Sequence, residues 1–402
     1  MAPKIFLTGA TGYIGGSVFH TLYTAHPEWT YTVLLRSAPP AAFSALYPAA
    51  HVVRGDYDSL ETTASAAIAA ADVVVHTGNS DHAPSLRALL RVLKAASSSD
   101  GAATAKQQTE KKKQTKYLIH LSGTGLLSDF QAPPVPVGSL NPRVYSDRSL
   151  ADNTDVFIPP PVSEPGSAGW KDPLHGETER IVREAWMREE EEEDEKDGDE
   201  AGVRVRTAVV RPPDIYGRGL GVGRKTSAYM PWFVKEILGG GGGGGEEGGE
   251  GVGAAFFVGE GQNRRGWVHL LDLMGLYLRL VEKAVEDGEG GGDGPTEAWG
   301  REGYYHATTQ ETSQFELAQA VGRILYEKGL IGEKEPKQVP LDRVDGMLKS
   351  VGVPLVGRYM FASNARSAAV RAKDVLGWEP KAPSIWDVLE QDVDDAVKSL
   401  GK

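Results

Sequence analysis

Apolar runs alternate with helical patterns along the first half of the chain. The pattern predicts six strands, at residues 4–9, 31–37, 51–56, 72–78, 116–123 and 205–212. Between them, apolar residues recur at helical spacing over residues 13–25, 60–71 and 83–96. Runs such as YTVLL and VVV are apolar on both faces, which is typical of strands covered by helices on both sides. The order of the elements predicts an α/β fold with a doubly wound parallel sheet.

The second half of the chain is less regular. It combines short apolar runs with helical patterns near residues 313–328, 340–350 and 384–399. These elements are too interleaved with the sheet to form a separate module. We therefore expect a Rossmann-like domain over residues 1–215 and a small, partly helical C-terminal cap over residues 216–402.

Four stretches have the composition of insertions. They lie near residues 98–115, 188–202, 239–253 and 287–300, and they are rich in polar residues, acidic residues or glycine. Because they offer little apolar area to bury, we expect disordered surface loops there.

Composition excludes several classes of protein. The net charge of −12 argues against a nucleic-acid binder, which would need a basic face. The chain has no cysteine, which excludes disulfides and thiolate metal sites, and its scattered histidines form no His-x-x-x-His pair, so we expect no metal. No run of about 18 apolar residues occurs and the start lacks a secretory pattern, so we expect a cytoplasmic protein without membrane contact.

The segment TGATGYIGG follows the first strand and begins the first helix. Gly9 allows a tight turn, Gly12 lets the backbone approach a diphosphate, and Gly15 lets the helix pack close to the strand. Backbone N–H groups and the positive end of the helix dipole would then face the phosphates. Because a strand precedes the glycines and a helix follows them, the segment predicts a dinucleotide site.

The end of the second strand indicates which dinucleotide binds. An acidic residue there would bind both ribose hydroxyls of NAD, whereas Arg36 suits the 2′-phosphate of NADP and Ser37 adds a donor. NADP is therefore preferred and NAD is the alternative, although Arg36 could equally mark a solvated strand end. After the third strand, Asp56 either accepts from the adenine amino group or caps the next helix.

Seven motifs, in their order and spacing, resemble the short-chain dehydrogenase/reductase superfamily, in its extended, epimerase/dehydratase-like branch. They are TGATGYIGG, GDYDS, DVVVHTGNSD, YLIHLSGTG, RPPDIYGRG, GWVHLLDL and LGWEPK. The resemblance covers nearly the whole chain apart from the insertions, and it implies an enzyme that uses a nicotinamide dinucleotide. It also implies that the cofactor is contacted by Thr8, Gly9, Thr11, Gly12, Tyr13, Ile14, Gly15, Asp56, Tyr57, Thr77, Gly78, Asn79 and Pro212.

One segment departs from the family pattern. In that family a tyrosine exchanges a proton with the substrate, and a lysine four residues later binds the nicotinamide ribose. A serine or threonine from the fifth strand orients the substrate oxygen, a role that would fall here to Ser122 or Thr124. The segment LHGETERIVREA aligns with the tyrosine–lysine helix but carries His175 and Glu179 at the two key positions.

Three interpretations of this departure are open. Residues four apart share a helix face, and a carboxylate stabilises a charged imidazole, so Glu179 would let His175 donate a proton near neutral pH. Alternatively, a relocated tyrosine donates the proton: Tyr145, on the long loop after the fifth strand, or Tyr216, just after the sixth. In the third interpretation, the two residues form a structural surface pair.

The carboxyl edge of the sheet also offers substrate contacts, because doubly wound sheets bind ligands there. The candidates are Ser80, Tyr216 and Arg264; in sugar-nucleotide relatives an arginine near position 264 grips a diphosphate. The leading hypothesis is an NAD(P)-dependent oxidoreductase or epimerase/dehydratase-like enzyme acting on a small carbonyl or alcohol substrate. The alternative is a catalytically weak NAD(P)-binding regulator or sensor. Many relatives pair through the helices expected near 83–97 and 173–188, so a homodimer and a monomer both stay open.

Overall fold

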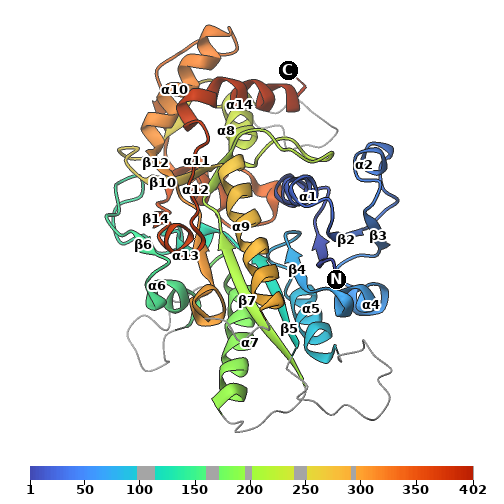
Figure 1. The fold of residues 1–402 in the computed structure, drawn as a ribbon. Coiled ribbons are helices and arrows are strands. Elements are labelled where there is room, and N and C mark those ends of the chain that lie inside the picture. Colours follow the sequence, from blue (N-terminus) through green and yellow to red (C-terminus); the bar gives the residue numbers. More distant parts are fainter. Residues whose placement is uncertain (97–113, 160–171, 195–201, 240–250, 291–295, 402) are drawn as a thin grey trace, which may run out of the picture.

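The computed structural model describes residues 1–96, 114–159, 172–194, 202–239, 251–290 and 296–401. Its main feature is a seven-stranded sheet in the order β11-β7-β5-β4-β1-β2-β3, in which all neighbouring strands are parallel (Figure 1). The strands are β1 (Lys4–Thr8), β2 (Thr30–Leu35), β3 (His51–Arg54), β4 (Val73–His76), β5 (Gln114–Leu121), β7 (Val203–Arg211) and β11 (Tyr304–His306). This confirms the predicted doubly wound parallel sheet, to which the C-terminal half adds β11.

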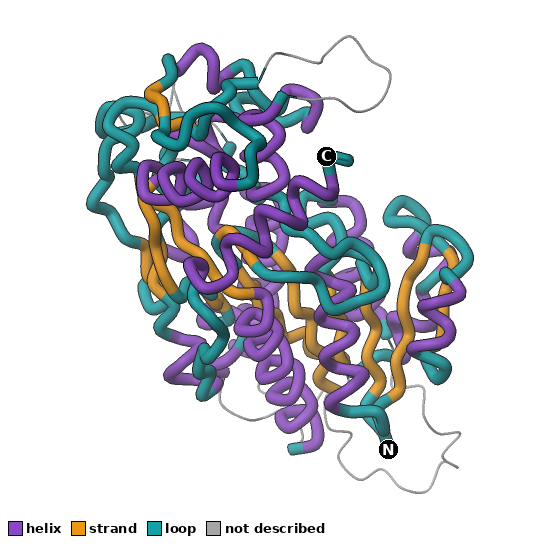
Figure 2. Tube along the Cα trace, turned by 90° about the horizontal axis from the view of Figure 1, so that it is seen from above, coloured by secondary structure: helices purple, strands orange, loops and turns teal. Residues whose placement is uncertain are grey.

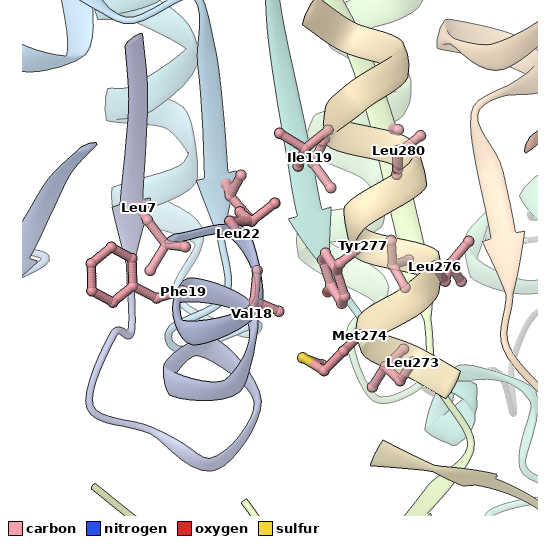
Figure 3. Close-up of a cluster of buried hydrophobic side chains, with 14 of the residues drawn as sticks. Leu7, Val18, Phe19, Leu22, Ile119, Leu273, Met274, Leu276, Tyr277 and Leu280 are labelled. Carbon is pink, nitrogen blue, oxygen red and sulfur yellow. The ribbon is translucent and has the colours of Figure 1, made fainter. Parts of the chain in front are cut away.

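Helices α1 (Tyr13–Ala25) and α9 (Leu270–Glu289) cover one face of this sheet. Figure 3 shows Val18 and Phe19 of α1 beside Leu7 of β1, and Tyr277 of α9 beside Ile119 of β5. All five side chains are fully buried. Burial of each such side chain stabilises the fold by about 1.5–3 kcal/mol. The short helix α2 (Ala41–Leu46) packs on the same cluster.

Strand residues that alternate with these point to the opposite face. Phe6, Val74 and Leu118 form a second buried cluster with Leu89 and Val182 of the covering helices. Those helices are α3 (Leu60–Thr63), α4 (Ser65–Ala70), α5 (Ala83–Ala95) and α7 (Gly176–Asp194). The sheet is therefore apolar on both sides, as its sequence pattern indicates.

Smaller elements gather at one end of the main sheet (Figures 1 and 2). Three small sheets contain β8 (Asp214–Tyr216), β10 (Arg264–His269) and β12 (Gln310–Ser313); β9 (Phe256–Phe257) and β13 (Lys337–Gln338); and β6 (Tyr145–Ser146) and β14 (Ser367–Ala368). The helices are α6 (Leu150–Thr154), α8 (Tyr229–Leu238), α10 (Gln314–Glu327), α11 (Leu341–Asp345), α12 (Val356–Ala362), α13 (Arg371–Leu376) and α14 (Ile385–Ser399). A third apolar cluster holds most of these helices together. Asp272, at the start of α9, accepts the backbone N–H groups of Lys381 and Ala382 and so ties the chain before α14 to the sheet.

The insertion boundaries expected from composition are partly wrong. α7 continues to Asp194, α9 continues to Glu289, and β5 already begins at Gln114. A carboxylate oxygen of Glu189 in α7 lies 2.5 Å from Nζ of Lys94 in α5, and this pairing offsets the repulsion within the acidic run. Within the expected insertions, residues 98–113, 195–201, 240–250 and 291–295 lie outside the described residues.

Within the described ranges, no helix combines the length and apolar character needed to cross a bilayer.

Candidate active site

The glycine-rich turn joins β1 to α1 with little room for side chains. Gly9 has a φ of 81°, and a Cβ there would lie 2.6 Å from the carbonyl oxygen of Thr77. A Cβ at Gly15 would lie 2.5 Å from the carbonyl oxygen of Gly9. α1 begins at Tyr13 with Gly12 as its N-cap; no described side chain caps it, and its first turn has no acidic residue. Its first N–H groups are therefore open to an anion such as a diphosphate.

Several side chains near this turn are engaged within the protein. The Thr8 hydroxyl lies 2.8 Å from Nδ1 of His76, and the Tyr13 hydroxyl donates to the carbonyl of Gly217 at 2.5 Å. Ile14, the second residue of α1, is partly buried and packs against the core. Tyr13 and Ile14 can therefore reach a bound cofactor through their backbone N–H groups and not through their side chains.

A segment of the cap closes one side of the turn. Residues 217–223, GRGLGVG, place a glycine at every second position. The N–H of Arg224 donates to the carbonyl of Thr11 at 3.3 Å, and a Cβ at Gly223 would lie only 1.9 Å from that oxygen. The missing side chains let the two backbones meet, so the cap and the predicted dinucleotide turn form one unit.

The ends of β2 and β3 carry the residues expected on the adenosine side. Arg36 and Ser37 are exposed directly after β2. The Asp56 carboxylate accepts the N–H of Ser59, the N-cap residue of α3, at 2.9 Å, and α3 itself has no side-chain capping hydrogen bond among the described residues. The phenol of Tyr57, one residue further on, lies toward the loop after β4.

Tyr57 fills the space that Gly78 leaves. A Cβ at Gly78 would lie 1.6 Å from the Tyr57 hydroxyl oxygen. Burial raises the pKa of Tyr57, and Arg36 is close enough to oppose that rise. The structure thus brings three predicted cofactor residues, Arg36, Tyr57 and Gly78, to one place beside the turn.

The loop after β4 runs from Thr77 to Asp81. The Thr77 hydroxyl donates to the carbonyl of Thr8 at 2.8 Å, which ties β4 to β1. Asn79 is exposed, and its side-chain oxygen accepts the N–H of Asp81 at 3.1 Å. The hydroxyl of Ser80 is half-buried and lies 3.4 Å from Nδ1 of His175.

His175 stands immediately before α7 in an unusual backbone conformation. Its φ is 65°, in the left-handed region that residues with a Cβ seldom adopt. Its Nδ1 lies 2.8 Å from Oδ1 of Asp81, and its side chain is 16% exposed. The Nε2 edge packs against Gly123, where a Cβ would lie 3.0 Å from Nε2. The imidazole therefore has one nitrogen on a carboxylate and the other beside the end of β5.

The expected partnership of His175 with Glu179 is wrong. Glu179 is fully buried, and its carboxylate binds Arg211 at 2.8 Å through Nε and at 2.9 Å through Nη2. Arg211 is also fully buried, and its guanidinium lies 4.6 Å from the ring centroid of Tyr304. A buried guanidinium needs a carboxylate, and Glu179 meets that need, so it is not a partner for the imidazole.

Ser122 and Thr124 both lie at the end of β5. The Ser122 hydroxyl donates to Glu179 at 2.6 Å, so toward a substrate it can only accept a hydrogen bond. Thr124 is buried and starts a short 3-10 helix, and its N–H donates to the carbonyl of Pro212 at 3.0 Å. Thr124 is therefore the residue of this pair whose hydroxyl can still donate.

Tyr145 lies on β6 and packs against Leu126 and Leu127, which follow β5. The guanidinium carbon of Arg143 is 4.9 Å from its ring centroid. Burial raises the pKa of Tyr145, although Arg143 opposes the rise, so the phenol stays protonated near neutral pH.

Tyr216 does not face a substrate, contrary to the expectation from sequence. It is 2% exposed; its hydroxyl donates to the carbonyl of Pro383 at 2.8 Å and accepts from the Gln310 side chain at 2.5 Å. Burial raises its pKa well above the usual range. Arg264 is half-buried on β10, and its Nη1 lies 3.7 Å from Oε2 of Glu316.

Histidines that are far apart in sequence gather under this site. The rings of His76 and His120 are stacked with their centroids 5.4 Å apart, and neither ring nitrogen of His120 has a partner among the described residues. Burial lowers the pKa of His120 to about 3, and nearby His175 adds to the effect. In the described parts of the chain, no group of three or more His, Asp or Glu side chains could hold a metal ion.

Sequence reasoning missed two residues of this site, Asp81 and Arg211. Asp81 stands directly after the predicted substrate residue Ser80, in a loop at the carboxyl edge of the sheet. Arg211 ends β7 directly after the buried apolar run of residues 208–210, and a charge at such a position needs a buried partner. The position of Asp81 on that edge and the apolar setting of Arg211 were signals that could have identified them.

The chain shares its fold with solved dehydratase and epimerase structures. A dTDP-glucose 4,6-dehydratase double mutant, DesIV from Streptomyces venezuelae, solved with NAD and DAU bound, matches with a TM-score of 0.55 and 16% identity, over 99% of this chain and 98% of that one. The UDP-glucose 4-epimerase of Thermotoga maritima, solved with UDP-glucose, matches with a TM-score of 0.51 and 15% identity, over 99% of both chains. The terminal R domain from the myxalamid PKS-NRPS biosynthetic pathway matches with a TM-score of 0.57 and 15% identity, over 99% of this chain and 91% of that one. At these identities, the likeness establishes the fold alone.

A curated protein is related in sequence along its whole length. It is named Oxidase ucsJ, from Acremonium sp., and is 27% identical over 403 residues, which span 100% of this chain and 99% of the relative. No protein-family model matches the sequence.

Proposed function

We propose that the protein is an NAD(P)-dependent oxidoreductase that acts on a small carbonyl or alcohol substrate with His175 as its acid–base residue. One observation carries this proposal: the glycine-rich turn and the His175 imidazole lie at the same carboxyl edge of the sheet. Gly9 packs on Thr77, and the loop that Thr77 begins leads within four residues to the contact of Asp81 with His175. Ligands of doubly wound sheets bind at this edge.

The turn fits a dinucleotide. The N–H groups of Tyr13 and Ile14 would hold the diphosphate, and the glycines leave room for it. DesIV, which shares the fold, was solved with NAD bound. Arg36 and Ser37, exposed after β2, favour the 2′-phosphate of NADP over the free ribose of NAD. A nicotinamide dinucleotide held there supplies a hydride to a carbonyl carbon or accepts one from an alcohol.

In this proposal, the side chains of His175, Thr124 and Ser122 contact the substrate oxygen. Nε2 of His175 gives a proton to the oxygen as an alcohol forms, or takes the hydroxyl proton as an alcohol is oxidised. The Thr124 hydroxyl can donate to that oxygen, whereas Ser122, whose proton is held by Glu179, accepts. The name of the relative, Oxidase ucsJ, agrees with redox chemistry.

Kinetics over a substrate panel tests this proposal. Oxidation of NADPH and NADH is followed with aldehydes, ketones and sugar nucleotides, and reduction of NADP⁺ and NAD⁺ with the corresponding alcohols. The His175→Ala variant should lose most of the rate while binding the dinucleotide as the wild type does. Arg36→Ala should weaken NADPH binding about tenfold or more and leave NADH binding unchanged. If calorimetry detects neither NADPH nor NADH binding, the proposal is wrong.

A second candidate function is an NAD(P)-binding regulator or sensor with little activity. It is favoured by Glu179, which stands where related enzymes keep a ribose-binding lysine and is sealed in a buried ion pair. Tight NADPH binding with no turnover across the panel, in both the wild type and His175→Ala, would support this candidate.

The outer faces of α5 and α7 could pair two copies of the chain. Between these helices lies a hollow of about 390 Å³ with Leu90, Ile181 and Ala185 in its wall and charged residues at its rim. Analytical ultracentrifugation of the wild type and of Ala185→Arg tests a homodimer, because an arginine there would oppose close packing.

A further inference from the structure

Asp81 and His175 come from segments 94 residues apart and meet at the carboxyl edge of the sheet. Asp81 lies in the loop between β4 and α5, and His175 immediately precedes α7. The 2.8 Å between Oδ1 and Nδ1 is the length of a charge-assisted hydrogen bond. This contact uses the nitrogen of the imidazole that points away from Gly123, and it leaves Nε2 at the end of β5.

Both residues are held in place by their own backbones. The N–H of Asp81 binds the side chain of Asn79, and the carbonyl of Asp81 accepts the N–H of Ala83 at 3.1 Å, where α5 begins. The carbonyl of His175 accepts the N–H of Glu179 at 3.0 Å and so starts α7. The left-handed conformation of His175 is unfavourable for a side chain with a Cβ, and such conformations persist where the surroundings fix them.

We propose that Asp81 is a positioning residue that accepts the Nδ1 proton of His175, fixes its tautomer and presents Nε2 to the substrate oxygen. This inference rests on the proposed function of His175. In the neutral imidazole, the proton then resides on Nδ1, and Nε2 carries the lone pair that accepts a substrate proton. In the charged form, Nε2 carries the proton to be donated, and the carboxylate stabilises the positive charge.

The other groups around the imidazole do not replace Asp81 in this role. His120, from β5, is neutral near neutral pH because burial lowers its pKa to about 3. Tyr359, from α12, reaches Gly125 just beyond the end of β5, and burial raises its pKa, so it too is neutral. The hydroxyl of Ser80, at 3.4 Å, is a weaker partner for Nδ1 than the carboxylate at 2.8 Å.

A surface ion pair without a catalytic role is the competing explanation. The Asp81 side chain is 54% exposed, and exposed pairs contribute little to stability. Burial, the largest single effect, raises its carboxyl pKa, but the hydrogen bonds and the charge of His175 together outweigh burial, so the pKa is lowered. The two explanations differ in what they predict for the tautomer and for the rate, and hardly differ for stability.

The experiment compares Asp81→Asn with Asp58→Asn. Asp58 is a matched control, because its carboxylate lies 3.2 Å from Nε2 of His82 on the same rim and is 84% exposed. Both variants remove one exposed carboxylate beside a histidine. Nitrogen-15 NMR of histidine-labelled protein, with the His175 signal assigned from His175→Ala, reports the tautomer without any substrate. The turnover number reports the role in the reaction.

We expect the wild type and Asp58→Asn to hold the proton of His175 on Nδ1, and Asp81→Asn to lose this preference. Asp81→Asn should lower the turnover number about 10- to 100-fold. This loss is smaller than the loss expected on removing a fully buried carboxylate from such a pair, because Asp81 is half exposed. Dinucleotide affinity and the circular dichroism spectrum should not change.

Two results would overturn the inference: a wild-type His175 with its proton on Nε2, or an Asp81→Asn variant that matches Asp58→Asn in tautomer and rate. A His175→Ala variant with full activity would instead refute the proposed function of His175, and the NMR comparison would still decide whether Asp81 sets the tautomer.

Discussion

Replacing His120 by glutamine should make the folded protein less sensitive to mild acid. His120 lies on β5 with no exposed surface and with no partner for either ring nitrogen among the described residues. Burial lowers its pKa to about 3, and the nearby imidazole of His175 adds to this lowering. In the unfolded chain a histidine titrates near pH 6.5. Between these two values the unfolded chain binds a proton at residue 120 that the folded protein does not bind.

The sign follows from this difference in bound protons. A histidine whose folded pKa is depressed leaves stability intact above pH 6.5, and stability is lost as the pH falls from there toward about 3. The fraction of residue 120 that is protonated in the unfolded chain, integrated from about pH 7.5 to pH 5, amounts to about 1.5 pH units. At 1.36 kcal/mol per unit, the folded protein therefore loses about 2 kcal/mol of stability over this range. His120→Gln removes this contribution, whereas every other titrating group acts equally in both proteins.

Urea unfolding at the two pH values measures the effect as a difference of differences. The wild type should lose about 2 kcal/mol more free energy of unfolding than His120→Gln between pH 7.5 and pH 5. His51→Gln is the control, because His51 is exposed on β3, and this variant should lose as much as the wild type. The constant cost of the substitution cancels in this comparison. Equal losses in the wild type and His120→Gln, within about 0.5 kcal/mol, would show that the imidazole is not kept neutral by burial.

Three further substitutions probe the site. In Gly123→Ala, the new Cβ would lie 3.0 Å from Nε2 of His175 and displace the imidazole; steady-state kinetics should show a turnover number lowered about tenfold or more, with dinucleotide affinity unchanged. In Glu179→Gln, Arg211 keeps a buried charge without a carboxylate, so thermal unfolding should reveal a loss of about 3–5 kcal/mol; a loss below about 1 kcal/mol would contradict the buried ion pair. In Gly15→Ala, the Cβ would lie 2.5 Å from a backbone oxygen of the turn, so calorimetry should detect no dinucleotide binding in a protein that still folds.

The features predicted correctly from the sequence are those set by residues close together in the chain. Each strand of the first half is visible as an apolar run, and the glycines of the first turn stand three residues apart between a strand and a helix. The prediction for the acidic run was wrong because its structure depends on a residue far away in the sequence. By composition it belongs in a loop, yet Glu189 and Glu192 continue α7 because both reach Lys94 of α5. The cation lies more than 90 residues away, and composition carries no information about it.

The partners of the residues in the candidate site are also far apart in sequence, so they could not be inferred. The free energies of the competing ion pairs explain which pair forms. Helix spacing places His175 and Glu179 four residues apart, and an exposed pair at that spacing is worth about 0.3–0.5 kcal/mol. Leaving Arg211 buried without a carboxylate would cost about 3–5 kcal/mol, roughly ten times more. Glu179 therefore points inward to Arg211 at the end of β7. The partly exposed imidazole of His175 binds the carboxylate of Asp81 instead, and that carboxylate stays in contact with water, so the pairing costs little desolvation energy. A helix pattern fixes which residues share a face, but the competition between buried and exposed charges decides which of them bind each other.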